Sequence, residues 1–360
     1  MKKFLFCLFV ICAFAIGYNV YHRSKEKANM GKRNVYAVLP LSGPMGQNGK
    51  DAKQVMDYYY KKENYPFNLI YIDSETNPSK AITALQQKTI NEERPIVITA
   101  LSSVTEAISP YLQKKDGFLF AISACNKDIP NFVRLHSDAE GIMEPVVSYL
   151  KQNYHKVAVV YVEDEFGRLE RNYLSEQLKN AEISMDEISI SLKTLDVRTE
   201  VLKIKDYDPD AVVIMGVPSQ GYINIMHELL AQNFEGQIFL DASITSPHVR
   251  KQLSDGIMGA SLLLEAEGPK SSTQKQFQED LDFMGFPVYY MPIEAVDAMN
   301  LIKYTLENNM QFSQNSYEKI GSWEGISGSV EFLHNGNTVY KYILVQYKEG
   351  QFVPVESEVE

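Results

Sequence analysis

The sequence predicts an α/β fold made of two successive arrays of alternating strands and helices. Short apolar segments of strand length recur along the chain, and segments with helical periodicity separate them. Clusters of Gly, Pro, Ser and Asn mark the turns between these segments. Strands that alternate with helices form parallel sheets through right-handed crossovers. We therefore expect two doubly wound, Rossmann-like lobes, each with a parallel central sheet.

The first array begins at residue 34. The expected strands cover residues 34–41, 68–72, 95–100 and 117–122. The expected helices cover residues 51–60, a segment that starts at 77, and 102–108. Asn77-Pro78-Ser79 indicates a helix start, because Asn is a good N-cap and Pro is favoured at the first helical position.

The second array begins at residue 155. Strands are expected over 155–161, within 181–190, over 211–215 and over 237–240, with helices over 167–178 and 221–232. The runs VAVVY and AVVIM are typical of strands buried on both faces. A helix over 293–306 follows, and then the segments 329–332 and 340–347 flank Asn335-Gly336-Asn337, which predicts a β-hairpin.

Composition and charge narrow the class of protein. The 360 residues are 45% hydrophobic and 22% charged, as in ordinary globular proteins, and the formal net charge is −11. Nucleic-acid binding needs clustered Lys and Arg, whereas the basic residues here are scattered. We therefore expect no nucleic-acid partner.

The segment 1–32 predicts export. Lys2 and Lys3 precede an apolar run over 4–16, and Ala13-Phe14-Ala15 offers a small-x-small cleavage site, as in a secretory signal peptide. The apolar character continues to Tyr21 and ends in a basic flank, so a retained N-terminal membrane anchor is the alternative. Both interpretations place the rest of the chain in the periplasm or cell envelope.

Catalytic and metal-binding motifs are missing from the sequence. No GxGxxG, P-loop or GxSxG motif occurs, and His227-Glu228 lacks the second histidine of HExxH. We interpret the six histidines as surface or packing residues. Cys125 is the single cysteine after the N-terminal segment, so neither an internal disulfide nor a cysteine-based metal site is expected there. We expect a protein that is not an enzyme and that has no metal or cofactor.

Two loops at the carboxyl ends of expected strands carry polar side chains. Ser102 and Ser103 follow a strand and open a helix, where hydroxyls and free backbone N–H groups bind carboxylates or phosphates. The alternative is that one of these serines only caps its own helix. The acidic run 163–165 is interpreted as a solvated loop, with attraction of a ligand amine as the alternative.

The ordered motifs of the exported chain resemble those of type I periplasmic binding proteins, the leucine/isoleucine/valine-binding family. The matching segments are VLPLSGP (38–44), DSETNPSKA (73–81), LSS (101–103), ISA (122–124), RLHSD (134–138), VAVVYVEDEFG (157–167), PDAVV (209–213), VDA (296–298) and GISGSVEF (325–332). Their order and spacing along the chain carry the resemblance.

The resemblance implies two lobes joined by three crossover strands. Lobe 1 would cover 33–137 and 266–325, lobe 2 would cover 138–265 and 326–355, and 356–360 would form a tail. The implied function is binding of a small polar metabolite (an amino acid, amide or small carboxylate) between the lobes and its delivery to an ABC transporter permease. The alternative is a sensor or envelope-interaction protein that keeps this fold without a role in transport.

The resemblance also implies the site residues. The solute carboxylate would lie against Ser102 and Ser103 and against the turn formed by Ala124, Cys125 and Asn126. Phe166 would cover the solute, and Tyr290 is a further cleft candidate with packing as its alternative. Relatives that bind amino acids pair the solute ammonium with an acidic residue, and Ser243 lies nearest to that position with Asp241 two residues away. This departure puts a plain aliphatic amino acid in doubt.

Overall fold

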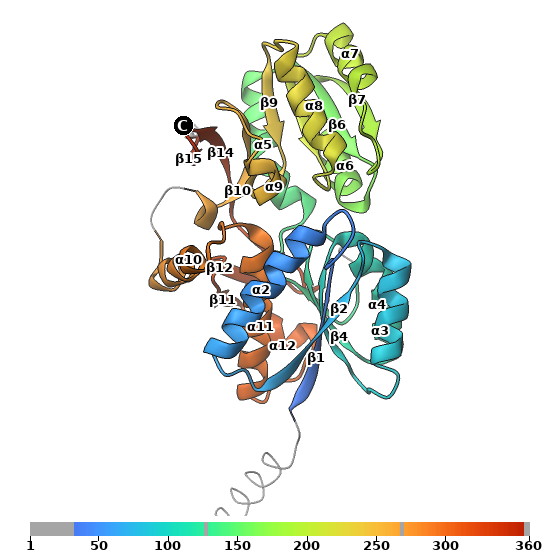
Figure 1. Ribbon diagram of the computed structural model, residues 1–360, viewed down its shortest axis with the longest axis vertical. Helices are drawn as coiled ribbons and strands as arrows, with labels where there is room; N and C mark the ends of the chain where they lie inside the picture. Colours follow the sequence, from blue (N-terminus) through green and yellow to red (C-terminus); the bar gives the residue numbers. More distant parts are fainter. Residues whose placement is uncertain (1–31, 126–128, 267–269, 356–360) are drawn as a thin grey trace, which may run out of the picture.

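The computed structural model describes residues 32–125, 129–266 and 270–355. The predictions for the N-terminal segment 1–31, for Asn126 and for the tail lie outside these residues. Figure 1 shows two α/β lobes, one above the other, joined by extended segments of the chain.

The lower lobe is built on a parallel sheet with the strand order β2-β1-β3-β4-β5. Its strands in the described chain are β1 (Arg33–Leu39), β2 (Phe67–Asp73), β3 (Ile96–Ala100), β4 (Phe118–Ile122) and β5 (Phe132–Arg134). Successive side chains of a strand point to opposite faces, so Val35 and Ala37 join one hydrophobic core while Tyr36 and Val38 join another. The sheet is therefore covered on both faces.

Helices cover the two faces of this sheet. The helices α2 (Gly46–Lys62) and α11 (Tyr290–Glu307) pack together on one face, and α3 (Pro78–Lys88) and α4 (Ser102–Lys114) pack together on the other. As predicted, Asn77 caps α3: its side chain accepts a hydrogen bond from the backbone N–H of Lys80. Gly49 of α2 lies close to the preceding loop, because a Cβ there would come within 2.1 Å of the Pro40 carbonyl oxygen.

The upper lobe is built on a mixed sheet with the order β15-β14-β10-β9-β8-β6-β7. Its parallel strands are β6 (Lys156–Val162), β7 (Ser184–Ile190), β8 (Ala211–Met215), β9 (Gln237–Leu240) and β10 (Met258–Leu262). The strands β14 (Tyr342–Lys348) and β15 (Gln351–Pro354) extend the sheet in antiparallel pairing. Its helices are α5 (Ala139–Asn153), α6 (Glu165–Asn180), α7 (Arg198–Tyr207) and α8 (Gln220–Ala231), followed by the short η1 (Ala242–Thr245), α9 (Pro247–Arg250) and η2 (Leu263–Glu265).

The hairpin predicted over 329–347 is wrong in its second strand. In the small third sheet, β12 (Ser329–Phe332) pairs with β11 (Ser322–Glu324) and with the two-residue β13 (Thr338–Val339). The chain then leaves this sheet, and β14 pairs with β10 in the upper lobe. The turn at Gly336 packs instead on β5, where the Arg134 backbone N–H donates to the Gly336 carbonyl oxygen. The helices α10 (Ser272–Met284) and α12 (Gln314–Ile320) complete the described elements.

The chain passes between the lobes at three places in its described part. These passages lie between β5 and α5, between β10 and α10, and between β13 and β14. The predicted fold class, two doubly wound lobes joined by three crossovers, is therefore confirmed. The residue boundaries of the lobes stay a prediction. Within the described ranges, no helix combines the length and the apolar character that a membrane crossing needs.

Candidate functional site

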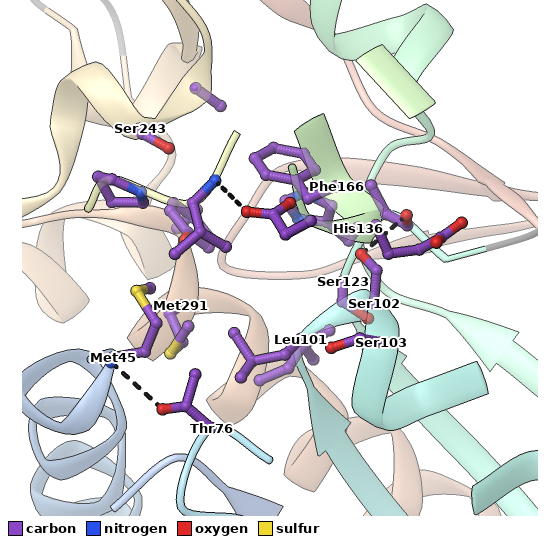
Figure 2. A pocket seen from close by; sticks show the side chains of 18 of the residues that line it. Met45, Thr76, Leu101, Ser102, Ser103, Ser123, His136, Phe166, Ser243 and Met291 are labelled. Atoms are coloured by element: carbon purple, nitrogen blue, oxygen red, sulfur yellow. Dashed lines mark hydrogen bonds between the residues drawn. The ribbon is translucent and has the colours of Figure 1, made fainter. Parts of the chain in front are cut away.

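A cleft lies between the lobes and is lined by loops at the carboxyl ends of strands of both sheets (Figure 2). The lining residues are Met45, Thr76, Leu101, Ser102, Ser103, Ile122, Ser123, Ala124, His136, Asp164, Glu165, Phe166, Leu192, Val217, Pro218, Ala242, Ser243, Tyr290 and Met291. The centre of a water molecule can reach about 70 Å³ of this space. One water needs about 10–15 Å³ on the same measure, so the cleft suits a small molecule.

The lower wall contains the start of α4. The residue before this helix, Leu101, has φ +78°, a left-handed conformation that is unusual for a bulky side chain. No side chain caps the helix, so the alternative role of Ser102 or Ser103 as a cap for α4 is wrong. The first N–H groups of a helix have no partner within the helix, and the residues at this helix start, Leu101, Ser102 and Ser103, line the cleft.

The two serines of this wall have different surroundings. The buried Ser102 hydroxyl donates to the Ala124 carbonyl oxygen at 2.9 Å and so joins the loops that follow β3 and β4. Ser103 is half-buried, and its hydroxyl has no hydrogen-bond partner among the described residues. The Ser123 hydroxyl is already engaged, because it forms a hydrogen bond of 2.9 Å with the Thr105 hydroxyl. Ser103 is therefore the serine with a hydroxyl free for a ligand.

The upper wall carries the predicted Phe166 and two carboxylates that are already engaged. Asp164 caps α6 by accepting from the Gly167 backbone N–H at 2.8 Å, and its other oxygen accepts from Val217 N–H at 3.0 Å. Burial raises the pKa of Asp164 to about 6, although these two bonds favour the ionised form. Glu165 forms an ion pair with Arg168 at 3.4 Å. Both carboxylates of the upper wall are therefore already engaged, Asp164 by two backbone N–H groups and Glu165 by Arg168.

Asp241 does not line the cleft, although the sequence analysis named it as a site residue. It is completely buried, and its carboxylate accepts from the backbone N–H groups of Gly216 and Ser243 at 2.6 and 2.8 Å. The Tyr222 hydroxyl donates to it at 3.2 Å. Asp241 therefore holds together the loops after β8 and β9, and Ser243 is the residue of this pair that faces the cleft.

Glu170 of α6 is also completely buried and lies against Asp241. Burial and the charge of Asp241 raise the pKa of Glu170 well above its ordinary value. Neither carboxyl oxygen of Glu170 has a hydrogen-bond partner among the described residues. Burial also raises the pKa of Asp241, but the backbone N–H groups of Gly216 and Ser243 oppose this rise. Glu170 is therefore the carboxyl of this pair whose surroundings most favour the protonated form.

The structure brings six of the nine predicted site residues into the cleft: Ser102, Ser103, Ala124, Phe166, Ser243 and Tyr290. The Cys125 side chain is buried outside the lining, and its carbonyl oxygen accepts from Arg134 at 2.9 Å. Asn126 lies outside the described residues. Tyr290 both lines the cleft and contacts the His136 ring, with ring centroids 5.5 Å apart.

The sequence analysis missed the apolar lining and His136. Met45, Val217 and Met291 lie in the lining with no polar signal that marks them in the sequence. His136 was interpreted as a surface or packing residue, but it lies at the first passage between the lobes and lines the cleft. The sequence carried no signal for this role, because the three-residue strand β5 before it was not predicted. Within the described ranges, no group of three or more His, Cys, Asp and Glu side chains could hold a metal ion.

Comparisons with known proteins agree with this architecture. A family model described as "Periplasmic binding protein" matches residues 35–303. No curated protein matches the chain significantly. Among solved structures, a leucine-binding protein from Thermotoga maritima is 15% identical with a TM-score of 0.80, covering 90% of this chain and 98% of that one. A solute-binding protein of an ABC transporter from R. palustris, in complex with benzoate, is 15% identical with a TM-score of 0.79, covering 90% and 96%.

An extracellular ligand-binding receptor from Desulfohalobium retbaense is 19% identical with a TM-score of 0.77. The match covers 90% of this chain and 60% of the receptor. The family model spans most of the chain, and the two lobes with their inter-lobe cleft match these neighbours in fold. The chain therefore belongs to the type I periplasmic binding proteins, in the leucine/isoleucine/valine-binding-like family.

Proposed function

We propose that this protein binds a small, largely apolar carboxylate without an α-amino group and delivers it to an ABC permease from the periplasm or cell envelope. One observation carries the proposal: the uncapped start of α4, with the free Ser103 hydroxyl beside it, opens into a cleft whose other walls are mainly apolar. Benzoate in the R. palustris neighbour is a solute of this chemical class.

The physical argument has two halves. Backbone N–H groups at the start of a helix attract an anion, since they lack partners and lie at the positive end of the helix dipole. An ammonium group would compete in the lining with partners that Asp164 and Glu165 already have, and Asp241 lies outside the lining. A neutral apolar body instead finds Leu101, Phe166 and Val217 around it. This combination favours a carboxylate over a zwitterionic amino acid.

The geometry does not favour catalysis. The Ser102 hydroxyl donates its proton to a carbonyl oxygen, so no base withdraws that proton to make a nucleophile. His136 and Glu294 form a pair at the first passage of the chain between the lobes. Neither of them is a hydrogen-bond partner of Ser102 within the described residues. We therefore infer binding without chemical conversion of the solute.

A second candidate function is a sensor or envelope-interaction protein that keeps the fold and binds no transported solute. The small space in the cleft and its apolar lining favour this candidate. The two functions differ in whether a free small molecule stabilises the protein.

A thermal-shift panel tests the proposal. Benzoate and 4-methylpentanoate are expected to raise Tm, because a ligand at 100 times its Kd adds about 2.7 kcal/mol to the free energy of unfolding. Leucine, which adds an ammonium to the same aliphatic skeleton, is expected to raise Tm much less. A larger shift with leucine than with 4-methylpentanoate would contradict the proposed absence of an ammonium site. No shift with any compound would favour the sensor.

Replacing Ser103 by alanine is expected to weaken benzoate binding by about 1.5–3 kcal/mol, the usual worth of a hydrogen bond to a charged group. The matched control is Ser102→Ala, because the Ser102 hydroxyl is already bonded to Ala124. Its effect on affinity is expected to be smaller than that of Ser103→Ala. Isothermal titration calorimetry with both variants measures the difference, and a reversed order would show that Ser102 is the serine that binds the carboxylate.

A further inference from the structure

His136 lines the cleft at the first passage of the chain between the lobes, two residues after the end of β5. In the lower sheet β3, β4 and β5 are neighbours, and their carboxyl ends carry Ser102, Ser123 and His136 in that order. Adjacent strands are about 4.8 Å apart, so β5 lies roughly 10 Å from β3. A carboxylate held at the start of α4 does not span that distance. His136 therefore meets a different part of the solute.

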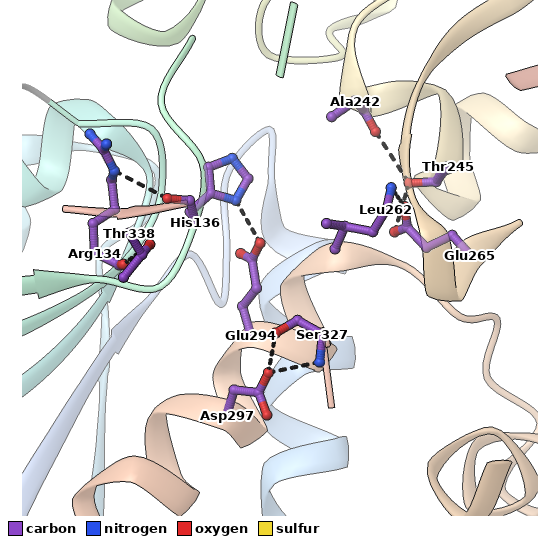
Figure 3. Close-up of polar contacts among 10 residues, drawn as sticks. All are labelled: Arg134, His136, Ala242, Thr245, Leu262, Glu265, Glu294, Asp297, Ser327 and Thr338. Atoms are coloured by element: carbon purple, nitrogen blue, oxygen red, sulfur yellow. Dashed lines mark hydrogen bonds and ion pairs between the residues drawn. The ribbon is translucent and has the colours of Figure 1, made fainter. Parts of the chain in front are cut away.

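One ring nitrogen of His136 has a hydrogen-bond partner, and the other has none among the described residues. Its Nδ1 atom lies 2.7 Å from Oε1 of Glu294, a completely buried residue of α11 (Figure 3). The Nε2 atom has no hydrogen-bond partner among the described residues, and it is not one of the side-chain atoms sealed from solvent without a partner. Because the ring lines the cleft, Nε2 is the nitrogen available to a solute (Figure 2).

The surroundings decide which nitrogen carries the proton. Burial and the nearby charge of Arg134 lower the pKa of His136 to about 3, against an opposing effect of Asp138, so the ring is neutral. Burial and the charge of Asp297 raise the pKa of Glu294 well above its ordinary value. These two pKa directions favour a neutral Glu294 whose hydroxyl donates to Nδ1, and in that arrangement the ring proton resides on Nε2.

The other ionisable groups around the pair are acidic or phenolic. They are Glu265 of η2, Tyr290 and Asp297 of α11, and Tyr340 and Tyr342 on the last passage between the lobes. Asp297 disfavours a negative charge on Glu294. A charge on Glu294 would in turn raise the pKa values of Glu265 and of the three tyrosines. The one cation among the groups named here is Arg134, which acts on His136. The backbone of His136 is also fixed, because Nε of Arg134 donates to its carbonyl oxygen at 3.1 Å. The geometry thus presents one fixed N–H donor to the cleft.

We propose that His136 determines specificity: its Nε2–H donates a hydrogen bond to an oxygen of the solute that is remote from the carboxylate, with Glu294 as the positioning residue. The chemical class is an apolar carboxylate with a distal oxygen acceptor, for which 4-hydroxybenzoate is a suitable probe. This inference rests on the proposed function, since it assumes that the carboxylate lies at α4.

The experiment compares Kd values for 4-hydroxybenzoate, benzoate and 4-aminobenzoate by calorimetry. The aromatic amine has nearly the size of the phenol but is a poor acceptor. Wild-type protein is expected to bind 4-hydroxybenzoate about tenfold more tightly than the other two, as for one added hydrogen bond. In His136→Asn, whose amide does not reach the Nε2 position, this ratio is expected to fall to about one. In His136→Gln, whose amide reaches it, part of the ratio is expected to return.

Two variants of Glu294 test the positioning role. Glu294→Gln still offers an N–H donor to Nδ1 and is expected to keep the ratio, whereas Glu294→Leu is expected to lose it. An independent measurement on wild-type protein is the ¹⁵N spectrum of the His136 ring, where a protonated Nε2 and an unprotonated Nδ1 are expected. The opposite tautomer, or a ratio that His136→Asn leaves unchanged, would overturn the inference. If benzoate binds and the wild-type ratio is about one, this inference alone fails; if no carboxylate binds, the proposed function fails with it.

Discussion

Replacing Arg134 by alanine is expected to lower the free energy of unfolding by about 3–5 kcal/mol, as for the loss of one partner from a buried ionic contact. The guanidinium is completely buried at the first passage between the lobes. It donates to the carbonyl oxygens of Cys125 and His136 at 2.9 and 3.1 Å, and it lies 3.3 Å from the Asp138 carboxylate. Alanine leaves these acceptors without their donor and leaves a cavity in the hinge.

Urea denaturation of wild-type protein and variant measures this change. The matched control is Arg198→Ala, which removes an exposed guanidinium 2.6 Å from Asp196 and is expected to change the free energy of unfolding much less than Arg134→Ala does. Arg134→Lys is expected to recover only part of the loss, since an ammonium lacks the planar fork that reaches several acceptors. Equal losses of unfolding free energy for Arg134→Ala and Arg198→Ala would show that Arg134 stabilises the fold no more than an exposed arginine does.

The second large effect concerns Glu170 and Asp241, the two buried carboxyl groups beneath the cleft. Substituting them is expected to change the free energy of unfolding in opposite directions. The pKa of Glu170 is raised well above its unfolded value near 4.5, so the folded protein keeps a proton that the unfolded chain releases as the pH rises above that value. Wild-type stability therefore falls with rising pH through this group. Glu170→Gln removes this proton release and keeps nearly the size and shape of the side chain. We expect the variant to match wild type near pH 4 and to exceed it at pH 8 by more than about 1.4 kcal/mol, the worth of one pK unit.

Asp241→Asn is expected to act in the other direction. The carboxylate accepts from Gly216 N–H and Ser243 N–H with different oxygens, whereas an amide has only one oxygen. One buried N–H then faces another donor, at a cost of about 2–4 kcal/mol. Urea denaturation of both variants at pH 4, 6 and 8 compares them. Equal destabilisation by both substitutions at pH 8 would contradict the raised pKa of Glu170 and the distinct role of Asp241 as an acceptor of backbone N–H groups.

Much of the fold was predictable because strands buried on both faces are continuous apolar runs. The strands observed at Ala211–Met215 and Gln237–Leu240 have the predicted bounds, and those of β1 to β4 differ from the predicted ones by no more than two residues. The strand β5 was missed because three residues carry no detectable period. The helix α5 was also missed, although Asp138 caps it by accepting from the Gly141 N–H.

The error at β14 has a different cause. A turn with alternating flanks is a local signal for a hairpin, but pairing is decided by which edge is available. The turn at Gly336 is occupied with β5, and the edge of β10 accepts β14 across the passage between the lobes. A local pattern does not contain that choice of partner.

For the site, the strand ends read from the sequence pointed to Ser102 and Ser103, and the family resemblance of the sequence pointed to Ala124, Phe166 and Ser243, all of which line the cleft. Only the tertiary structure decided which polar atoms are free. The Asp241 carboxylate already accepts from backbone donors, and the Ser102 hydroxyl is bonded to Ala124. One ring nitrogen of His136 is bonded to Glu294, which lies 158 positions later in the chain. The physical reason is that order along a strand fixes position, whereas the availability of a donor or acceptor depends on partners that folding brings from distant segments.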